Sequence, residues 1–127
     1  MHSNAKLPFM VDFNFCLATD SYKHSHWKMY PPGTEKVVLY LENRSFKFAD
    51  KVPEGPVVSF GIQYIIDHYL AGPVVTMEMV EEARTELAEH FGSDNVFNYE
   101  GFKYLVEEYG GKLPISIRAV DEGQLAI

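Results

Sequence analysis

A short segment near the N-terminus gathers side chains that could bind a charged aromatic ligand. Residues 19–30 read Thr-Asp-Ser-Tyr-Lys-His-Ser-His-Trp-Lys-Met-Tyr. An exposed Tyr22 at the start of a helix could stack on a ring, and more strongly on a cationic ring. Asp20 could accept a hydrogen bond from a ligand, or it could cap the helix while Tyr22 fills the core. The residues alone leave both interpretations open.

A second candidate, Arg44, ends the run Lys-Val-Val-Leu-Tyr-Leu-Glu-Asn-Arg at residues 36–44. Its β-branched and aromatic residues predict a strand, and because both faces are apolar we expect a central strand covered on both sides. Ligand-contacting residues gather at strand ends in such folds, and a guanidinium fork suits a phosphate or diphosphate. The alternative is an ordinary surface arginine.

Other reactive side chains give weaker signals. His24 and His26 stand two apart, so on a helix their side chains point in different directions and are not expected to share a metal ion. Cys16, between Phe15 and Leu17, is expected to be a buried, inert thiol. The sequence contains no glycine-rich phosphate loop and no Gly-x-Ser-x-Gly nucleophile elbow.

The elements that must position these residues follow from periodicity and capping residues. We expect a helix from about Asp20 to the Pro-Pro-Gly stop at 31–33, with Tyr22, His26 and Tyr30 on one face. After an N-terminal arm (residues 1–13) and a loop (45–56), further helices are predicted near 62–70, 77–91 and 99–109. A half-buried strand is predicted at 113–120, followed by a turn and the start of another strand within 121–127.

This order predicts an α+β fold, with a small few-stranded sheet covered by about three to four helices. The 127 residues match one domain, 1–127, and are short for an enzyme with two substrates. The net charge of −7 argues against general nucleic-acid binding. The single cysteine excludes an intrachain disulfide. With no apolar run long enough for a bilayer and no signal-peptide pattern, we expect a cytoplasmic protein without a membrane partner.

Several motifs, in one order, resemble the N-terminal part of the nicotinamide phosphoribosyltransferase family, a type II phosphoribosyltransferase family. The resemblance covers about residues 13–127. It rests on Leu17-Ala18-Thr19-Asp20-Ser21-Tyr22-Lys23, Tyr30-Pro31-Pro32-Gly33-Thr34, Glu42-Asn43-Arg44, Phe60-Gly61-Ile62-Gln63-Tyr64-Ile65, Val96-Phe97-Asn98, Leu113-Pro114-Ile115 and Ala119-Val120-Asp121-Glu122-Gly123. The last motif departs from the family, which usually has Pro-Glu-Gly. Thr-Asp-Ser-Tyr-Lys favours the nicotinamide branch over the related nicotinate enzymes, which remain an alternative.

The resemblance implies an activity and roles for three residues. Family enzymes transfer phosphoribosyl from 5-phosphoribosyl 1-diphosphate to nicotinamide, giving nicotinamide mononucleotide for NAD salvage. They act as homodimers with shared active sites, use Mg²⁺ with the diphosphate, and can be activated by ATP. Tyr22 matches a family tyrosine that reaches from one subunit to stack on the pyridine ring bound at the neighbouring subunit. Asp20 matches an acidic residue beside that ring, and Arg44 matches a cation that contacts the phosphate groups of the sugar diphosphate.

The resemblance also implies what the chain lacks. The family's catalytic barrel has no counterpart here, so we expect no catalytic residue and no bound metal within this chain, and no transferase activity from it alone. A stand-alone module that binds or regulates a full-length enzyme is an alternative. An unrelated α+β domain is another, which predicts a buried Tyr22. The uncovered strands near 113–120 and 125–127 predict an exposed apolar surface and self-association.

Overall fold

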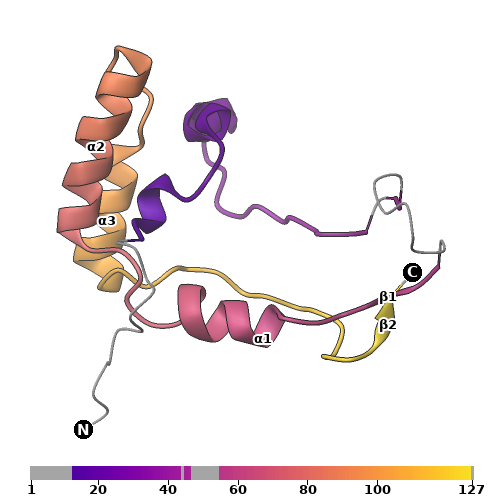
Figure 1. The fold of residues 1–127 in the computed structure, drawn as a ribbon. Coiled ribbons are helices and arrows are strands. Elements are labelled where there is room, and N and C mark those ends of the chain that lie inside the picture. Colours follow the sequence, from indigo (N-terminus) through magenta and orange to yellow (C-terminus); the bar gives the residue numbers. More distant parts are fainter. Residues whose placement is uncertain (1–12, 44, 47–54, 127) are drawn as a thin grey trace, which may run out of the picture. The chain divides into compact units, whose positions relative to one another are not determined.

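The computed structural model of the chain describes residues 13–43, 45–46 and 55–126 (Figure 1). They form two compact units: the chain up to Tyr30 with Gly72–Leu113, and Pro31–Ala71 with Pro114–Ile127. The described elements are helices and one small antiparallel sheet, which confirms the predicted α+β class. All but the last residue of the expected N-terminal arm (1–13) and most of the expected loop (45–56) lie outside the described residues. The single domain 1–127 remains a prediction.

Helix α2 (Met77–Phe91) has the bounds that its capping residues predict. The Thr76 hydroxyl accepts a hydrogen bond from the Met79 amide at 3.3 Å, which satisfies one of the unpaired donors of the first turn. Gly92 ends the helix in the left-handed conformation, with φ of 63°. The predicted stripe points into the core, since Val80 and Ala83 are fully buried.

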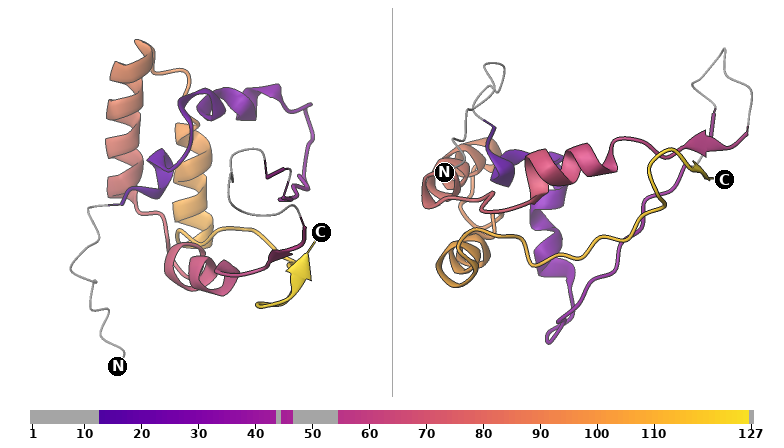
Figure 2. Two further views of the ribbon diagram at one scale, coloured as in Figure 1. Left: turned by 45° about the vertical axis from the view of Figure 1, so that its right-hand side comes forward. Right: turned by 90° about the horizontal axis from the view of Figure 1, so that it is seen from below.

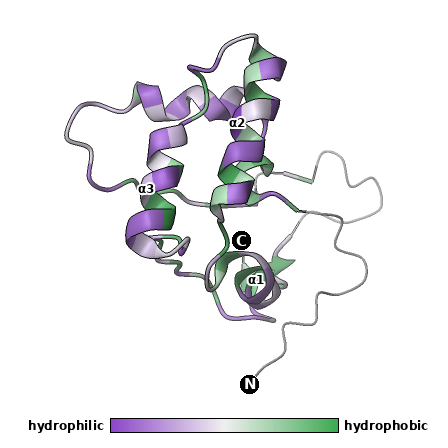
Figure 3. Ribbon diagram, turned by 90° about the vertical axis from the view of Figure 1, so that its left-hand side faces the viewer, coloured by the Kyte–Doolittle hydropathy of each residue, from purple (hydrophilic) through white to green (hydrophobic). Residues whose placement is uncertain are grey.

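Helix α3 (Tyr99–Tyr109) lies beside α2, as the views in Figures 1 and 2 agree. The Asn98 side chain caps it by accepting from the Gly101 amide at 3.1 Å. Gly110 and Gly111 both have positive φ and end it, as expected. Figure 3 shows that both helices carry hydrophobic and hydrophilic residues on different faces. Tyr109, the last residue of α3, is half exposed.

The core of this first unit lies between α2, α3 and the short 3₁₀ helix η1 (Phe15–Leu17). Its buried residues are Cys16, Val75, Val80, Ala83, Leu87 and Phe97. Asn14 joins η1 to α2: its Nδ2 donates to the Met79 carbonyl at 2.9 Å and to the Glu82 carboxylate at 2.7 Å. Its Oδ1 accepts from the Cys16 amide at 2.9 Å, so one side chain both caps η1 and anchors it.

The second unit contains helix α1 (Ile62–Ile65), which continues as one turn of π-helix, η3 (Ile66–Leu70). This is the helix predicted near 62–70. Strand β1 (Val57–Val58) pairs antiparallel with β2 (Leu125–Ala126), in register Val57 with Ala126 and Val58 with Leu125. A strand start near the end of the sequence was predicted, and β2 confirms it. Two residues per strand make a sheet too small to be stable without a further cover.

The prediction of a covered central strand at 36–44 is wrong for this chain. Residues 36–43 form no strand, and the side chains of Leu39 and Leu41 are 84% and 98% exposed. A strand needs neighbours for its backbone groups and a layer over each apolar face. The described part of the chain supplies neither for this segment. Arg44, at the end of the segment, lies outside the described residues.

The predicted half-buried strand at 113–120 is also wrong. Among the described residues the segment forms no ladder, and the isolated bridge nearest to it joins Lys112, just before the segment, to Pro73. Leu113 packs against the core of the first unit, but Ile115 and Ile117 are about half exposed. Alternating apolar residues favour a strand only where a partner strand and a covering layer exist.

Within the described residues, no helix is both long enough and apolar enough to cross a lipid bilayer.

Candidate functional site

The segment with the strongest chemical signal folds as the 3₁₀ helix η2 (Ser21–Met29). Asp20 occupies the N-cap position in an extended conformation, and Tyr30 follows the last turn before Pro31 and Pro32. The predicted position of the helix and its stop are therefore confirmed, but the helix is 3₁₀, and Tyr30, predicted to share a face with Tyr22 and His26, lies beyond its last residue. The Asp20 side chain, however, makes no capping hydrogen bond, so its carboxylate is available for another partner.

One side of η2 is anchored to the first unit. His24 is buried, with 9% of its surface exposed, and its ring meets the edges of Phe91 and Phe97 at centroid distances of 6.4 and 6.5 Å. Trp27 Nε1 donates to the Val96 carbonyl at 2.9 Å. Lys28 extends over the Trp27 ring, 5.3 Å from its centroid. These contacts fix which side of the helix faces the core.

The other side of η2 presents Tyr22, which is 63% exposed. His26 lies one turn further along, with its ring centroid 5.5 Å from that of Tyr22. The Lys23 ammonium is 5.6 Å from the Tyr22 ring centroid, within the range of a cation–π contact. The exposed Tyr22 contradicts the unrelated-domain alternative, which required it to be buried. A solvent-accessible aromatic ring held by an anchored helix can stack on a planar ligand.

Asp20 and Lys23 form an ion pair beside this ring. The Lys23 Nζ lies 2.8 Å from the Asp20 carboxylate. The hydrogen bond from Lys23 and its charge lower the pKa of Asp20 below its ordinary value, and the same contact raises the pKa of Lys23. Both groups are largely exposed, so the pair adds little to stability. Its consequence is that a carboxylate and an ammonium lie together next to Tyr22.

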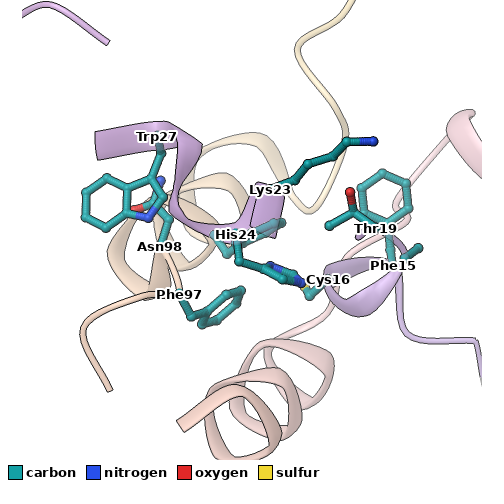
Figure 4. A pocket seen from close by; sticks show the side chains of 10 residues that line it. Phe15, Cys16, Thr19, Lys23, His24, Trp27, Phe97 and Asn98 are labelled. Atoms are coloured by element: carbon teal, nitrogen blue, oxygen red, sulfur yellow. The ribbon is translucent and has the colours of Figure 1, made fainter. Parts of the chain in front are cut away.

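A pocket of about 350 Å³ lies behind η2 (Figure 4). It is lined by Phe15, Cys16, Ala18, Thr19, Lys23, His24, Trp27, Phe97, Asn98 and Phe102. Cys16 is 2% exposed, and burial raises the pKa of its thiol to about 11. The predicted burial of the thiol is confirmed, and its raised pKa favours the protonated form, which is a poor nucleophile. Burial, with a smaller contribution from the charge of His90, lowers the pKa of His24.

The structure brings two of the three predicted site residues together. Asp20 and Tyr22 lie two residues apart at the start of η2, while Arg44 falls outside the described residues. His24 points inward to aromatic rings and His26 contacts Tyr22, so the two histidines have different neighbours. Across residues 13–43, 45–46 and 55–126, no three His, Cys, Asp or Glu side chains gather closely enough to hold a metal ion.

One polar contact in the second unit was not foreseen from the sequence. The Glu122 carboxylate accepts hydrogen bonds from the amides of Gly61 and Gln63, both at 2.9 Å, at the start of α1. These bonds lower the pKa of Glu122. Neither residue type nor spacing signals the contact, because about sixty residues separate the partners. Glu122 therefore positions α1 and is fully engaged in doing so.

Comparison with known proteins identifies relatives along most of the chain. Residues 14–117 match the family model described as nicotinamide phosphoribosyltransferase, N-terminal domain. A Xanthomonas campestris protein named nicotinamide phosphoribosyltransferase is 39% identical over 110 residues, which cover 87% of this chain and 21% of the relative. An Acinetobacter baylyi protein of the same name is 30% identical over 119 residues, which cover 84% of this chain and 22% of the relative. The chain thus spans about a fifth of the length of these relatives.

Proposed function

Because the chain belongs to the nicotinamide phosphoribosyltransferase family, we propose that it is the N-terminal domain of an enzyme that transfers phosphoribosyl from 5-phosphoribosyl 1-diphosphate to nicotinamide. In this reaction the pyridine nitrogen forms a bond to C1 of the ribose. The bond from C1 to the diphosphate oxygen breaks, and the diphosphate leaves with its electron pair. The ring, neutral in the substrate, is a pyridinium cation in the product.

The observation that supports this role is the exposed Tyr22 on a helix anchored by His24 and Trp27. An aromatic face attracts a cation more strongly than a neutral ring. Tyr22 stacked on the nicotinamide therefore favours the transition state and the product, in which positive charge develops on the ring, over the neutral substrate. Because the helix is already fixed, little ordering of the protein is needed on binding.

Asp20 has a complementary role in this proposal. Its carboxylate is ionised at neutral pH, and Lys23 lowers its pKa further, so it is an acceptor for an N–H donor such as the carboxamide. A negative charge near the ring also stabilises the developing pyridinium. Arg44 is proposed to contact the phosphates of the sugar diphosphate, for which a guanidinium fork is suited.

The remaining parts of the active site are proposed to come from outside this chain, which spans only about a fifth of its relatives. In this proposal, Tyr22 and Asp20 are presented to the catalytic barrel of a neighbouring subunit in a homodimer. The diphosphate is then bound mainly by that barrel, with Mg²⁺ accompanying it as part of the substrate complex. The isolated chain is accordingly inactive.

The test is an assay of nicotinamide mononucleotide formation with two proteins. The first is this chain alone, from which no turnover is expected; clear turnover would contradict the proposal. The second is a fusion in which this chain replaces the matching first fifth of the Xanthomonas relative, and this protein is expected to be active. In the fusion, Tyr22→Ala should lower kcat/KM about tenfold, corresponding to a cation–π contribution of about 1.4 kcal/mol.

Two variants serve as controls in that assay. Tyr22→Phe keeps the ring and should retain most of the activity. Tyr104→Ala removes another tyrosine that is more than half exposed, at 58%, on α3, and should leave kcat/KM unchanged. If the Tyr22→Ala and Tyr104→Ala fusions had the same kcat/KM, that result would contradict the proposed role of Tyr22.

A further inference from the structure

Residues 36–43, here called the apolar segment, expose hydrophobic side chains on both faces. Val38, Leu39, Tyr40 and Leu41 are 78%, 84%, 84% and 98% exposed. In the described part of the chain, none of the backbone groups from residue 35 to residue 43 forms a backbone hydrogen bond. Figure 1 shows the segment as an extended trace outside any helix or strand. Four neighbouring large apolar side chains at this exposure are unusual on a soluble protein surface.

The pattern of the apolar segment is that of a strand inside a sheet. Val37, Leu39 and Leu41 share one face and Val38 and Tyr40 share the other, so both faces need an apolar cover. Natural edge strands carry lysine, proline or an inward-pointing charge that blocks further pairing. Residues 37–41 contain no charged residue and no proline. The segment is therefore built for neighbours along both of its edges.

A second copy of this chain does not meet these needs. Pairing two apolar segments edge to edge would give a two-stranded ribbon with two outer edges still open and its faces still uncovered. The described strands of each copy, β1 and β2, have two residues each. By contrast, the relatives are almost five times as long as the part that this chain matches, so most of the family's chain lies outside it.

We infer that the apolar segment is an interior strand of a sheet whose other strands come from the part of the family's chain beyond this domain. The partner is thus a β-sheet with an open edge and apolar faces, which pairs with the segment through backbone hydrogen bonds on both sides. The identity of this partner rests on family membership and not on the proposed activity. The pairing would also hold the N-terminal domain, with Tyr22, on the remainder of the enzyme.

Hydrogen–deuterium exchange tests the pairing directly. In this chain alone, the amides of residues 36–43 should exchange near the rate of an unstructured peptide. In the fusion to the remaining four fifths of the Xanthomonas relative, they should exchange at least about 100-fold more slowly, since opening a ladder on both sides requires unfolding of the sheet. Equal exchange in the two proteins would overturn the inference. The readout needs no catalysis, so a protected but inactive fusion contradicts the proposed function alone.

Proline scanning distinguishes an interior strand from an edge strand. Successive backbone N–H groups point to opposite edges, so an edge strand tolerates proline at one of two adjacent positions while an interior strand tolerates neither. Leu39→Pro and Tyr40→Pro should each lower the melting temperature of the fusion by several degrees and remove the protection. In this chain alone, where these amides have no backbone partner among the described residues, neither substitution should change the melting temperature. Tolerance of either proline in the fusion would contradict an interior position.

Sedimentation completes the test. Protection of residues 36–43 in this chain alone, together with a dimer in sedimentation equilibrium, would assign the surface to a second copy and overturn the inference. If the fusion does not fold, this chain is refolded together with the separate remainder of the relative, and exchange is measured on the mixture. Absence of protection in both preparations counts against the inference.

Discussion

The Asp20 carboxylate lies 2.8 Å from the Lys23 ammonium, at the start of the helix that presents Tyr22. The same ammonium is 5.6 Å from the centre of the Tyr22 ring. One cation thus contacts both residues proposed to meet the pyridine ring. A ligand with a positive ring would compete with Lys23 for the same carboxylate and the same aromatic face, because both attract cations.

Replacing Lys23 should change the ionisation of Asp20. The hydrogen bond from Lys23 and its charge hold the pKa of Asp20 below its ordinary value near 3.8, so Lys23→Gln should raise that pKa toward the ordinary value. A carboxyl ¹³C NMR titration measures it. Lys28→Gln is the matched control, since Lys28 donates to Asn95 at 2.8 Å. An unchanged Asp20 titration in Lys23→Gln would show that the ion pair does not form in solution.

Burial of His24 should make the first unit less stable in mild acid. Burial lowers the pKa of this imidazole below its ordinary value near 6.5. Between the two values the unfolded chain binds more protons than the folded chain, so the free energy of unfolding falls as the pH drops. The stabilisation is complete above the unfolded pKa and is lost as the pH falls through the folded pKa. Urea unfolding at about pH 7.5 and about pH 5 measures the difference.

The matched variants for this pH effect lie on opposite sides of η2. His24→Phe keeps an aromatic ring against Phe91 and Phe97 and should reduce the loss of stability in acid. His26→Phe, on the Tyr22 side, should leave that loss in place. The same pH dependence in both variants would mean that another group causes it.

Two adjacent glycines should differ in their tolerance of alanine. Gly110 has a φ of 60° and open space at its Cβ position, so Gly110→Ala should cost about 1 kcal/mol for the left-handed conformation. Gly111 has a φ of 74°, and a Cβ there would collide with the Val75 carbonyl. Gly111→Ala should therefore cost about 3 kcal/mol or more, because the backbone must also move. Chemical denaturation of both variants measures this, and equal costs would contradict the close approach.

Removing the Asn14 side chain should destabilise the first unit by about 2 kcal/mol, because two hydrogen bonds that join η1 to α2 and the hydrogen bond that caps η1 are lost together. Asn95→Ala, which removes one exposed contact with Lys28, is the control and should cost much less. Urea unfolding gives both values. A negligible effect of Asn14→Ala would show that water replaces these bonds without cost.

Helix boundaries were the most predictable feature of the fold. Thr76 and Gly92 mark α2, and Asn98 and Gly110 mark α3, as the structure confirms. Each cap is a contact between residues at most five positions apart, so its energy depends little on the rest of the chain. The burial of Cys16 was predictable for a related reason, since its neighbours Phe15 and Leu17 already indicate a core position.

The strands were less predictable. Residues 36–44 and 113–120 have strand-like composition, but a strand gains its stability from partners that are distant in sequence. Local composition can therefore indicate that a segment is suited to a sheet without indicating whether this chain supplies the neighbours. For the same reason the Glu122 contact with Gly61 and Gln63 could not be foreseen.

For the candidate site, the sequence by itself determined that Asp20 and Tyr22 stand together at the start of a helix, because spacing and the Pro31-Pro32-Gly33 stop are local. Only the tertiary structure decided which side of that helix is free. The Trp27 bond to Val96 and the burial of His24 against Phe91 and Phe97 leave Tyr22 on the outward side. Those contacts join residues about seventy positions apart, and burial of that kind depends on the whole packing arrangement.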